Sequence, residues 1–268
     1  MTPAQLSRTV LLTMRRAVED GELCVAEGAD LPQDATAVTV ESPPRRGRGD
    51  YAVSIAFRLA RAVGRPPGEI AELLRTRLER EPGVARVEVA GGGFLNITLD
   101  DAARADLVRE LAAEDPGCCP DDPANDIAQW AAATGDDPEK LKVRKATVNP
   151  LFRVQYAHAR TRALLRNGGD LGVVAEACGT DNAASERALL ALLADHGRFC
   201  GAEAAAQARH LEAVADAFFD FHDSCPPLPR GGQKPGAAHR SRLALAEATG
   251  AVLAGGLTRL GVTAPAHL

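Results

Sequence analysis

The chain has 268 residues, of which 46% are hydrophobic and 25% are charged, and its formal net charge at pH 7 is −5. This length suits one or two domains with real cores, and the composition is ordinary for a soluble protein. No apolar run is long enough to span a bilayer, and the N-terminal segment alternates charged with apolar residues, unlike a signal peptide. We therefore expect a cytoplasmic protein without a membrane partner.

The six cysteines show no C-x-x-C spacing, and the six histidines show no H-E-x-x-H motif. A disulfide framework or a zinc site is therefore not expected, and reduced thiols are the default. No cofactor motif stands out either. We expect neither a metal nor a cofactor.

The charge is unevenly distributed. Residues 1–99 carry 13 basic and 13 acidic side chains, residues 100–139 carry 2 and 12, and residues 140–268 carry 16 and 11. The three segments thus have net charges of 0, −10 and +5. Because the local charge governs attraction for phosphates, a nucleic-acid partner of the last segment is compatible with the negative total.

Apolar periodicity predicts helices and strands in mixed order before residue 100. Helices are expected at 3–20, from about residue 51 after a capping Asp50, and from Pro66 to the break at Pro82–Gly83. Strands are expected at 37–41, 84–90 and 94–99. Gly91–Gly93 joins the last two strands as a hairpin turn, since no P-loop or dinucleotide spacing surrounds it. This order predicts an α+β domain, with helices on one face of a small antiparallel sheet.

The acidic segment is expected to connect two domains. A polar helix is predicted at 100–115, a proline-containing linker at 116–125 and a short helix within 126–139. We expect an N-terminal domain at 1–113, a poorly packed acidic linker at 114–137 and a C-terminal domain at 138–268.

The segment VNPLFRVQYAHARTRALLRN, residues 148–167, predicts a long helix capped by Asn149 with Pro150 in its first turn. Tyr156 lies one turn before Arg160, and Arg153 adds a further charge nearby. An aromatic ring beside guanidinium groups can stack RNA bases and hold phosphates. On periodicity alone, a core helix with a solvated basic flank is the favoured interpretation.

The remainder predicts an all-helical bundle. Two helices are expected between residues 185 and 223, a loop follows at 225–236, and a last helix precedes a short tail. The run FFDFH is typical of a core face, although Phe221 is also a candidate for binding a base.

The string NPLFRVQYAHAR resembles the opening helix of the DALR anticodon-binding domain of arginyl-tRNA synthetases, close to NPVFYVQYAHAR. Two N-terminal strings, GDYAVSIAFRLAR and VEVAGGGFLNITL, resemble the N-terminal additional domain of the same family. The resemblance implies that Tyr156 and Arg160 help to hold an anticodon loop, and that Phe94 and Asn96 contact the tRNA elbow. Gln155 matches the motif as a contact or a structural residue, and Arg153 replaces a common tyrosine.

The resemblance omits the catalytic domain of these synthetases. Residues 100–147 are too few for a nucleotide-binding domain, and neither an H-x-G-H nor a K-M-S-K motif is present. The resemblance therefore implies a non-catalytic protein that binds tRNA of the arginine type. Two alternatives stay open: a module that has lost RNA binding and docks a protein, and a subunit that presents tRNA to a separate tRNA-dependent enzyme.

Overall fold

The computed structural model describes residues 1–25, 31–41, 49–117, 120–178 and 183–268. The chain forms two compact units, Met1–Arg104 and Ala105–Leu268. Parts of three expected loops, at 42–48, 118–119 and 179–182, lie outside the described residues. None of the helices in the described ranges is both long and apolar enough to cross a membrane.

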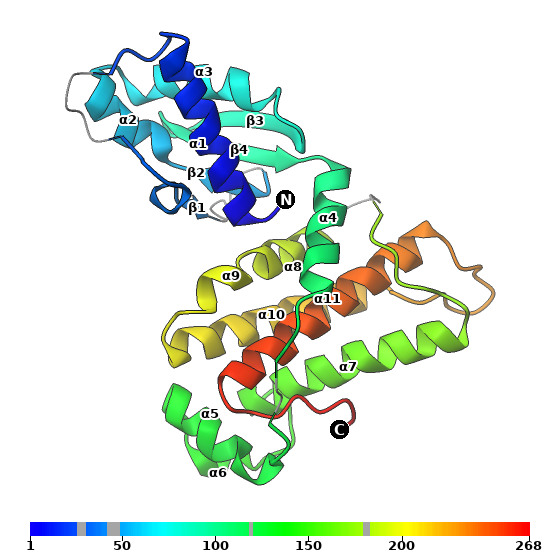
Figure 1. The fold of residues 1–268 in the computed structure, drawn as a ribbon. Helices are drawn as coiled ribbons and strands as arrows, with labels where there is room; N and C mark the ends of the chain where they lie inside the picture. The colour runs from blue at the N-terminus through cyan, green and yellow to red at the C-terminus, as the bar shows by residue number, and fades with distance from the viewer. Residues whose placement is uncertain (26–30, 42–48, 118–119, 179–182) are drawn as a thin grey trace. The chain divides into compact units, whose positions relative to one another are not determined.

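The first unit is an α+β layer, and this prediction is confirmed (Figure 1). All strand pairs are antiparallel, in the order β1-β2-β4-β3. The strands are β1 (Val40–Glu41), β2 (Tyr51–Val53), β3 (Val84–Ala90) and β4 (Phe94–Leu99). The helices are α1 (Pro3–Glu19), α2 (Ile55–Val63), α3 (Pro67–Leu78) and α4 (Asp101–Ala112), of which α4 continues into the second unit.

Two features of this unit follow directly from local chemistry. The side chain of Thr2 accepts a hydrogen bond from Gln5 N and so caps α1. Gly91 and Gly92 both have positive φ, which a residue with a side chain adopts only under strain, and Gly93 N donates to Ala90 O at 3.1 Å. The predicted hairpin turn is confirmed.

The expected role of Asp50 as a helix cap is wrong. Residues 51–53 form β2, and α2 begins only at Ile55. The Asp50 carboxylate instead accepts a hydrogen bond from Leu99 N at 2.7 Å and pairs with Arg104 at 3.0 Å. A strand of three residues is too short to show a period of two, so the sequence pattern did not separate β2 from the helix that follows.

The second unit is helical, as predicted (Figure 1). Its α-helices are α5 (Asp126–Thr134), α6 (Pro138–Leu141), α7 (Pro150–Asp170), α8 (Ala184–Ala194), α9 (His196–Phe199), α10 (Ala204–Ser224) and α11 (Ala237–Arg259). Helix α7 packs against α10 and α11, and α8 packs against the same two helices. Gly250 makes one of these crossings possible, because a Cβ atom there would lie 2.6 Å from the Thr161 hydroxyl.

The acidic linker at 114–137 was expected to be poorly packed, but its part from Asp126 onward contains buried side chains. Trp130 on α5 is fully buried, and its indole N–H donates to Asp136 at 3.0 Å. Asp126 itself is 6% exposed. Burying the large apolar surface of an indole ring stabilises the unit, so α5 forms part of the helical core.

Candidate nucleic-acid interface

Helix α7 starts as its sequence predicts. Asn149 Oδ1 accepts a hydrogen bond from Phe152 N at 3.0 Å, and Pro150 occupies the first turn. The Asn149 amide also donates to Leu141 O at 2.6 Å and to Val143 O at 3.0 Å. One buried side chain therefore caps α7 and fixes the preceding loop against it.

Three rings form a row on the surface of the second unit, which we call the aromatic row: Phe152, Tyr156 and Phe219. The Phe152 and Tyr156 rings are nearly parallel, with centroids 6.0 Å apart and an interplanar angle of 2°. The Tyr156 and Phe219 centroids are 5.6 Å apart at 24°. Tyr156 is 39% exposed, so its ring is held by its neighbours and still accessible to a planar ligand.

Two arginines next to the aromatic row have different environments. The guanidinium of Arg153 lies 2.5 Å from an Asp216 carboxylate oxygen, and the contact is an ion pair without the alignment of a hydrogen bond. Arg160 is exposed, and within the described ranges its guanidinium forms no ion pair and lies 3.5 Å from a ring nitrogen, His222 Nε2. Arg153 was expected to contact a phosphate, but Asp216 neutralises its charge. Arg160 has no such partner among the described residues, so its charge is available to a phosphate.

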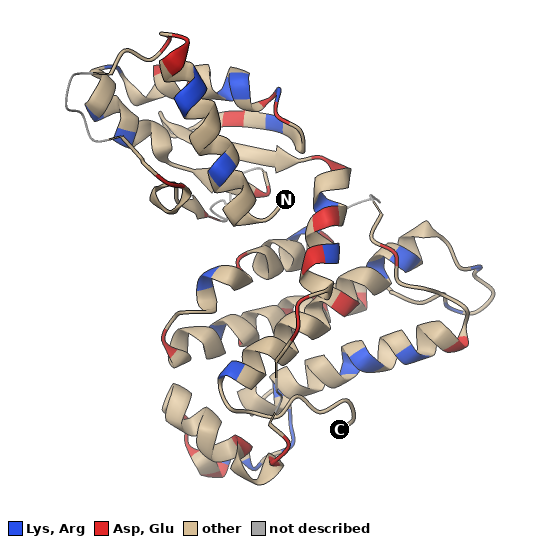
Figure 2. Ribbon diagram, in the orientation of Figure 1, with Lys and Arg blue, Asp and Glu red and all other residues tan. Residues whose placement is uncertain are grey.

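Acidic groups of α10 lie close to the row. Glu212 is half-buried, and its burial raises the pKa of the carboxyl, with further upward contributions from Asp136 and Asp216. Figure 2 shows basic residues at intervals along α7. The surface around the aromatic row is therefore of mixed charge, with its positive side along α7.

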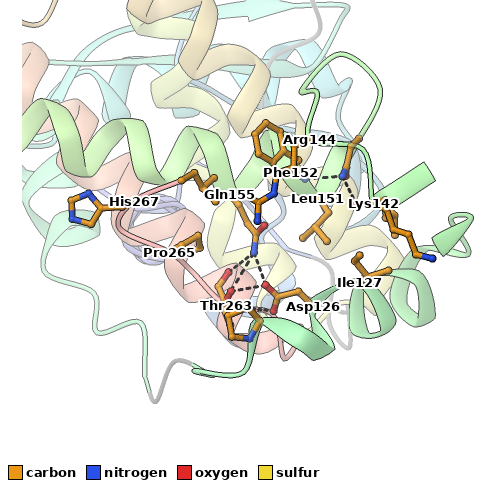
Figure 3. A pocket seen from close by; sticks show the side chains of 14 residues that line it. Asp126, Ile127, Lys142, Arg144, Leu151, Phe152, Gln155, Thr263, Pro265 and His267 are labelled. Atoms are coloured by element: carbon orange, nitrogen blue, oxygen red, sulfur yellow. Dashed lines mark hydrogen bonds between the residues drawn. The ribbon is translucent and has the colours of Figure 1, made fainter. Parts of the chain in front are cut away.

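The Gln155 side chain points into the unit and contacts residues far away in sequence (Figure 3). Gln155 Nε2 donates to Asp126 Oδ2 at 2.7 Å and to Thr263 O at 3.1 Å. Asp126 also accepts from Thr263 N at 2.8 Å and from the Thr263 hydroxyl at 2.5 Å. Because Gln155 is 8% exposed, the geometry supports its structural interpretation over direct contact with RNA.

His158 also fixes the C-terminal tail. Its Nδ1 lies 3.0 Å from Pro265 O, and burial lowers the pKa of the imidazole. A neutral His158 with Nδ1 protonated donates to that carbonyl. The tail after α11 is thus anchored to α7 at two successive points.

The anchored tail borders a pocket of about 460 Å³ (Figure 3). Its lining includes Phe152 and Gln155 of α7 and the exposed Lys142 and Arg144, which precede that helix. His267 and Leu268 complete the lining at the end of the chain. The pocket combines an aromatic ring with cationic groups, which suits an unstacked base and its phosphate.

In the first unit, Phe94 and Asn96 have opposite accessibility. Phe94 is 43% exposed and meets Phe57 edge-on, with ring centroids 4.9 Å apart. Asn96 is 6% exposed, between Ala52 and Glu88 of the neighbouring strands. Only the phenylalanine of this pair presents its side chain to a ligand in this conformation.

Sequence reasoning missed several residues of these surfaces. Phe219 was expected in the core and instead lies beside Tyr156, and Phe152 lies beside Tyr156 as well, whereas Phe221 is fully buried and cannot bind a base. The signal for Phe219 was present, because adjacent residues of a helix point about 100° apart and cannot all face one core. No local signal indicated that Asp126 and Thr263 meet, since they lie 137 residues apart.

Comparison with known proteins finds separate matches for the N-terminal and the C-terminal part of the chain. Residues 15–99 match the arginyl tRNA synthetase N terminal domain, and residues 154–268 match the DALR anticodon binding domain. The chain therefore combines two domains of arginyl-tRNA synthetases.

Individual relatives are arginine–tRNA ligases. That of Kineococcus radiotolerans is 36% identical over 179 residues, which cover 67% of this chain and 29% of the ligase. That of Renibacterium salmoninarum is 42% identical over 164 residues, covering 61% and 27%. A solved arginyl-tRNA synthetase of Thermus thermophilus has a TM-score of 0.41 at 23% identity, covering 64% of this chain and 32% of that one. The chain thus spans less than a third of the length of the ligases it matches.

Proposed function

We propose that this chain binds tRNA of the arginine type without aminoacylating it. The observation that carries the proposal is the aromatic row beside Arg160 within a DALR anticodon-binding domain. A loop nucleotide can pack against the exposed part of the Tyr156 ring, and Arg160 can hold a phosphate next to it. The pocket bordered by Phe152 and Leu268 provides room for a second, unstacked base.

The first unit would bind a different part of the same RNA. Phe94 is proposed to contact the tRNA elbow, because its ring is exposed and supported by Phe57. Asn96, which we expected to share this contact, is buried, so we propose that its side chain acts on RNA only through the position of β4.

A non-catalytic role is supported by the segment between the matched domains. Residues 100–153 separate the two matches. Within the described residues the only sheet is the antiparallel one of the first unit, and the sequence has neither of the two ATP-binding motifs of class I synthetases. A nucleotide-binding domain of that class would need a larger parallel sheet.

The decisive experiment is a titration of purified protein with an arginine tRNA transcript, a second tRNA and an unrelated RNA of equal length at low salt. Preferential binding of the arginine tRNA supports the proposal, and equal affinity for all three RNAs contradicts it. Sequencing the RNA that co-purifies with the protein identifies its partner without prior choice. Arginine-dependent ATP–pyrophosphate exchange by the same preparation would disprove the non-catalytic part.

A protein-docking role is the second candidate. It is favoured by the acidic segment 100–139, whose net charge of −10 would repel RNA and attract a basic partner. A third possibility joins the two: the chain presents bound tRNA to a separate tRNA-dependent enzyme. Co-purification of such an enzyme only when tRNA is present would favour this possibility.

A further inference from the structure

A second, smaller pocket lies on α7 beyond the aromatic row. It has a volume of about 180 Å³ and lies between α7, the end of α10 and the proline-rich loop after α10. Its polar lining consists of Arg160, Asn167, His222 and Arg230. Pro226 and neighbouring prolines, whose φ angles are fixed by their rings, also line it. We call it the proline-loop pocket.

The two arginines of this pocket are not neutralised by carboxylates. Over the described ranges, Arg160 and Arg230 make no ion pair within 4.0 Å, whereas Arg153, Arg240 and Arg242 are paired with Asp216, Glu176 and Glu186. Arg160 and Arg230 are both exposed. Two unpaired guanidinium groups beside one small cavity repel each other, and an anion between them would remove this repulsion.

His222 holds Arg160 at the edge of the pocket. Arg160 Nη2 lies 3.5 Å from His222 Nε2, and His222 Nδ1 lies 3.1 Å from Asp223 Oδ1. Since a guanidinium has only donors, Nε2 must accept and Nδ1 carries the proton donated to Asp223. In this arrangement the imidazole orients Arg160 toward the pocket.

The pocket is close to the aromatic row. Arg160 follows Tyr156 by four residues, which is one helical turn and a rise of about 6 Å. A nucleotide stacked on Tyr156 therefore has its backbone within reach of the pocket. Asn167 adds a neutral amide that can donate to a phosphate oxygen.

We propose that the proline-loop pocket is a phosphate-binding subsite in which Arg160, Asn167 and Arg230 contact the anion and His222 positions Arg160. This inference rests on the proposed function where the phosphate belongs to the RNA backbone. The same chemistry would accept free inorganic phosphate, so the test includes both sources.

The RNA arm compares wild type with Arg230→Gln and Arg160→Gln by measuring affinity for the arginine anticodon stem-loop over a range of potassium chloride concentrations. Each substitution is expected to reduce the slope of log affinity against log salt by about 0.7, the value for one phosphate of a single strand. Arg162→Gln is the matched control, because Arg162 is an exposed arginine of α7 outside the pocket lining, and it should leave the slope unchanged. Arg230→Lys should retain the slope, since the charge remains.

The phosphate arm titrates inorganic phosphate at constant ionic strength and follows the His222 ring signals by NMR, with His222→Gln for assignment. The signals should shift in wild type and not in Arg230→Gln. The subsite is disproved if wild type binds the stem-loop selectively, but Arg230→Gln keeps both the wild-type salt slope and the wild-type response of the His222 signals to phosphate. The proposed function would still stand in that case. If wild type binds no tRNA selectively, the proposed function fails, and a shift with inorganic phosphate that Arg230→Gln abolishes would still establish the subsite.

Discussion

The ring of Tyr156 on α7 stacks on the ring of Phe219 on α10, with centroids 5.6 Å apart and planes inclined by 24°. This contact joins two helices and fixes the orientation of a side chain that is 39% exposed. A ring held in this way loses little freedom when a base packs against its exposed part.

Replacing Tyr156 with alanine should weaken binding of the anticodon stem-loop by roughly 1–3 kcal/mol, the range for loss of one base–aromatic stack. Tyr156→Phe should retain most of the affinity, because the ring remains. The salt slope should not change in either variant, since no charge is removed. Fluorescence anisotropy titrations measure both quantities, and thermal melts establish that the variants are folded. Equal affinities for Tyr156→Ala and wild type would show that the aromatic row does not bind RNA.

Phe94→Ala should weaken binding of full-length tRNA and leave the isolated anticodon stem-loop unaffected, because the stem-loop lacks the elbow. Asn96→Ala should act differently, lowering the thermal midpoint more than the affinity, since the side chain is 6% exposed. Parallel titrations with the two RNAs make the comparison. A loss of stem-loop binding in folded Phe94→Ala would contradict a separate elbow contact.

Asp126→Ala should destabilise the second unit by about 3 kcal/mol. The carboxylate accepts three hydrogen bonds from Thr263 and Gln155, and hydrogen bonds to a buried charged group contribute roughly 1.5–3 kcal/mol each without being additive. Urea unfolding measures the change. Asp121→Ala is the control, because Asp121 is an exposed acid of the same segment and should change stability by less than about 0.5 kcal/mol. Equal midpoints for both variants would mean that the network does not stabilise the fold.

Two buried histidines should make the second unit sensitive to acid. Burial and the positive charge of Arg259, which contacts His196, together lower the pKa of His196 to about 3 and that of His210 to about 4. The unfolded chain protonates them near pH 6.5, so stability should be full above that pH and fall as the pH drops toward the folded values. The loss is about 2 kcal/mol per histidine between pH 7 and pH 5.

Urea unfolding of wild type and His210→Gln at pH 7 and pH 5 checks this linkage. The variant is expected to be less stable at both values of pH, since the His196 and His210 rings stack 5.6 Å apart, but its loss between pH 7 and pH 5 should be smaller by about 2 kcal/mol. An unchanged difference would show that His210 protonates as easily in the folded protein as in the unfolded chain.

The sequence by itself determined the features that depend on neighbouring residues. It determined the start of α7, because Asn149 caps a free N–H group of the first turn and Pro150 fits that turn. It also determined the turn at Gly91–Gly93, because only glycine adopts that backbone without strain. Most of the order of helices and strands followed from the same kind of signal. The exceptions are short elements, namely β2 and the single-turn helices α6 and α9, which are too short for a period to appear.

The tertiary structure decided which side chains remain available to a ligand. Arg153 and Arg160 are both basic residues of α7 close to Tyr156, and the sequence does not distinguish their environments. Of the two, only Arg153 pairs with a carboxylate, that of Asp216 on α10. Tyr156 is exposed and Phe221 buried although both belong to apolar helical patterns. The physical reason is that charge pairing and burial depend on residues more than 60 positions away, which helix packing brings within a few ångströms and which no local periodicity encodes.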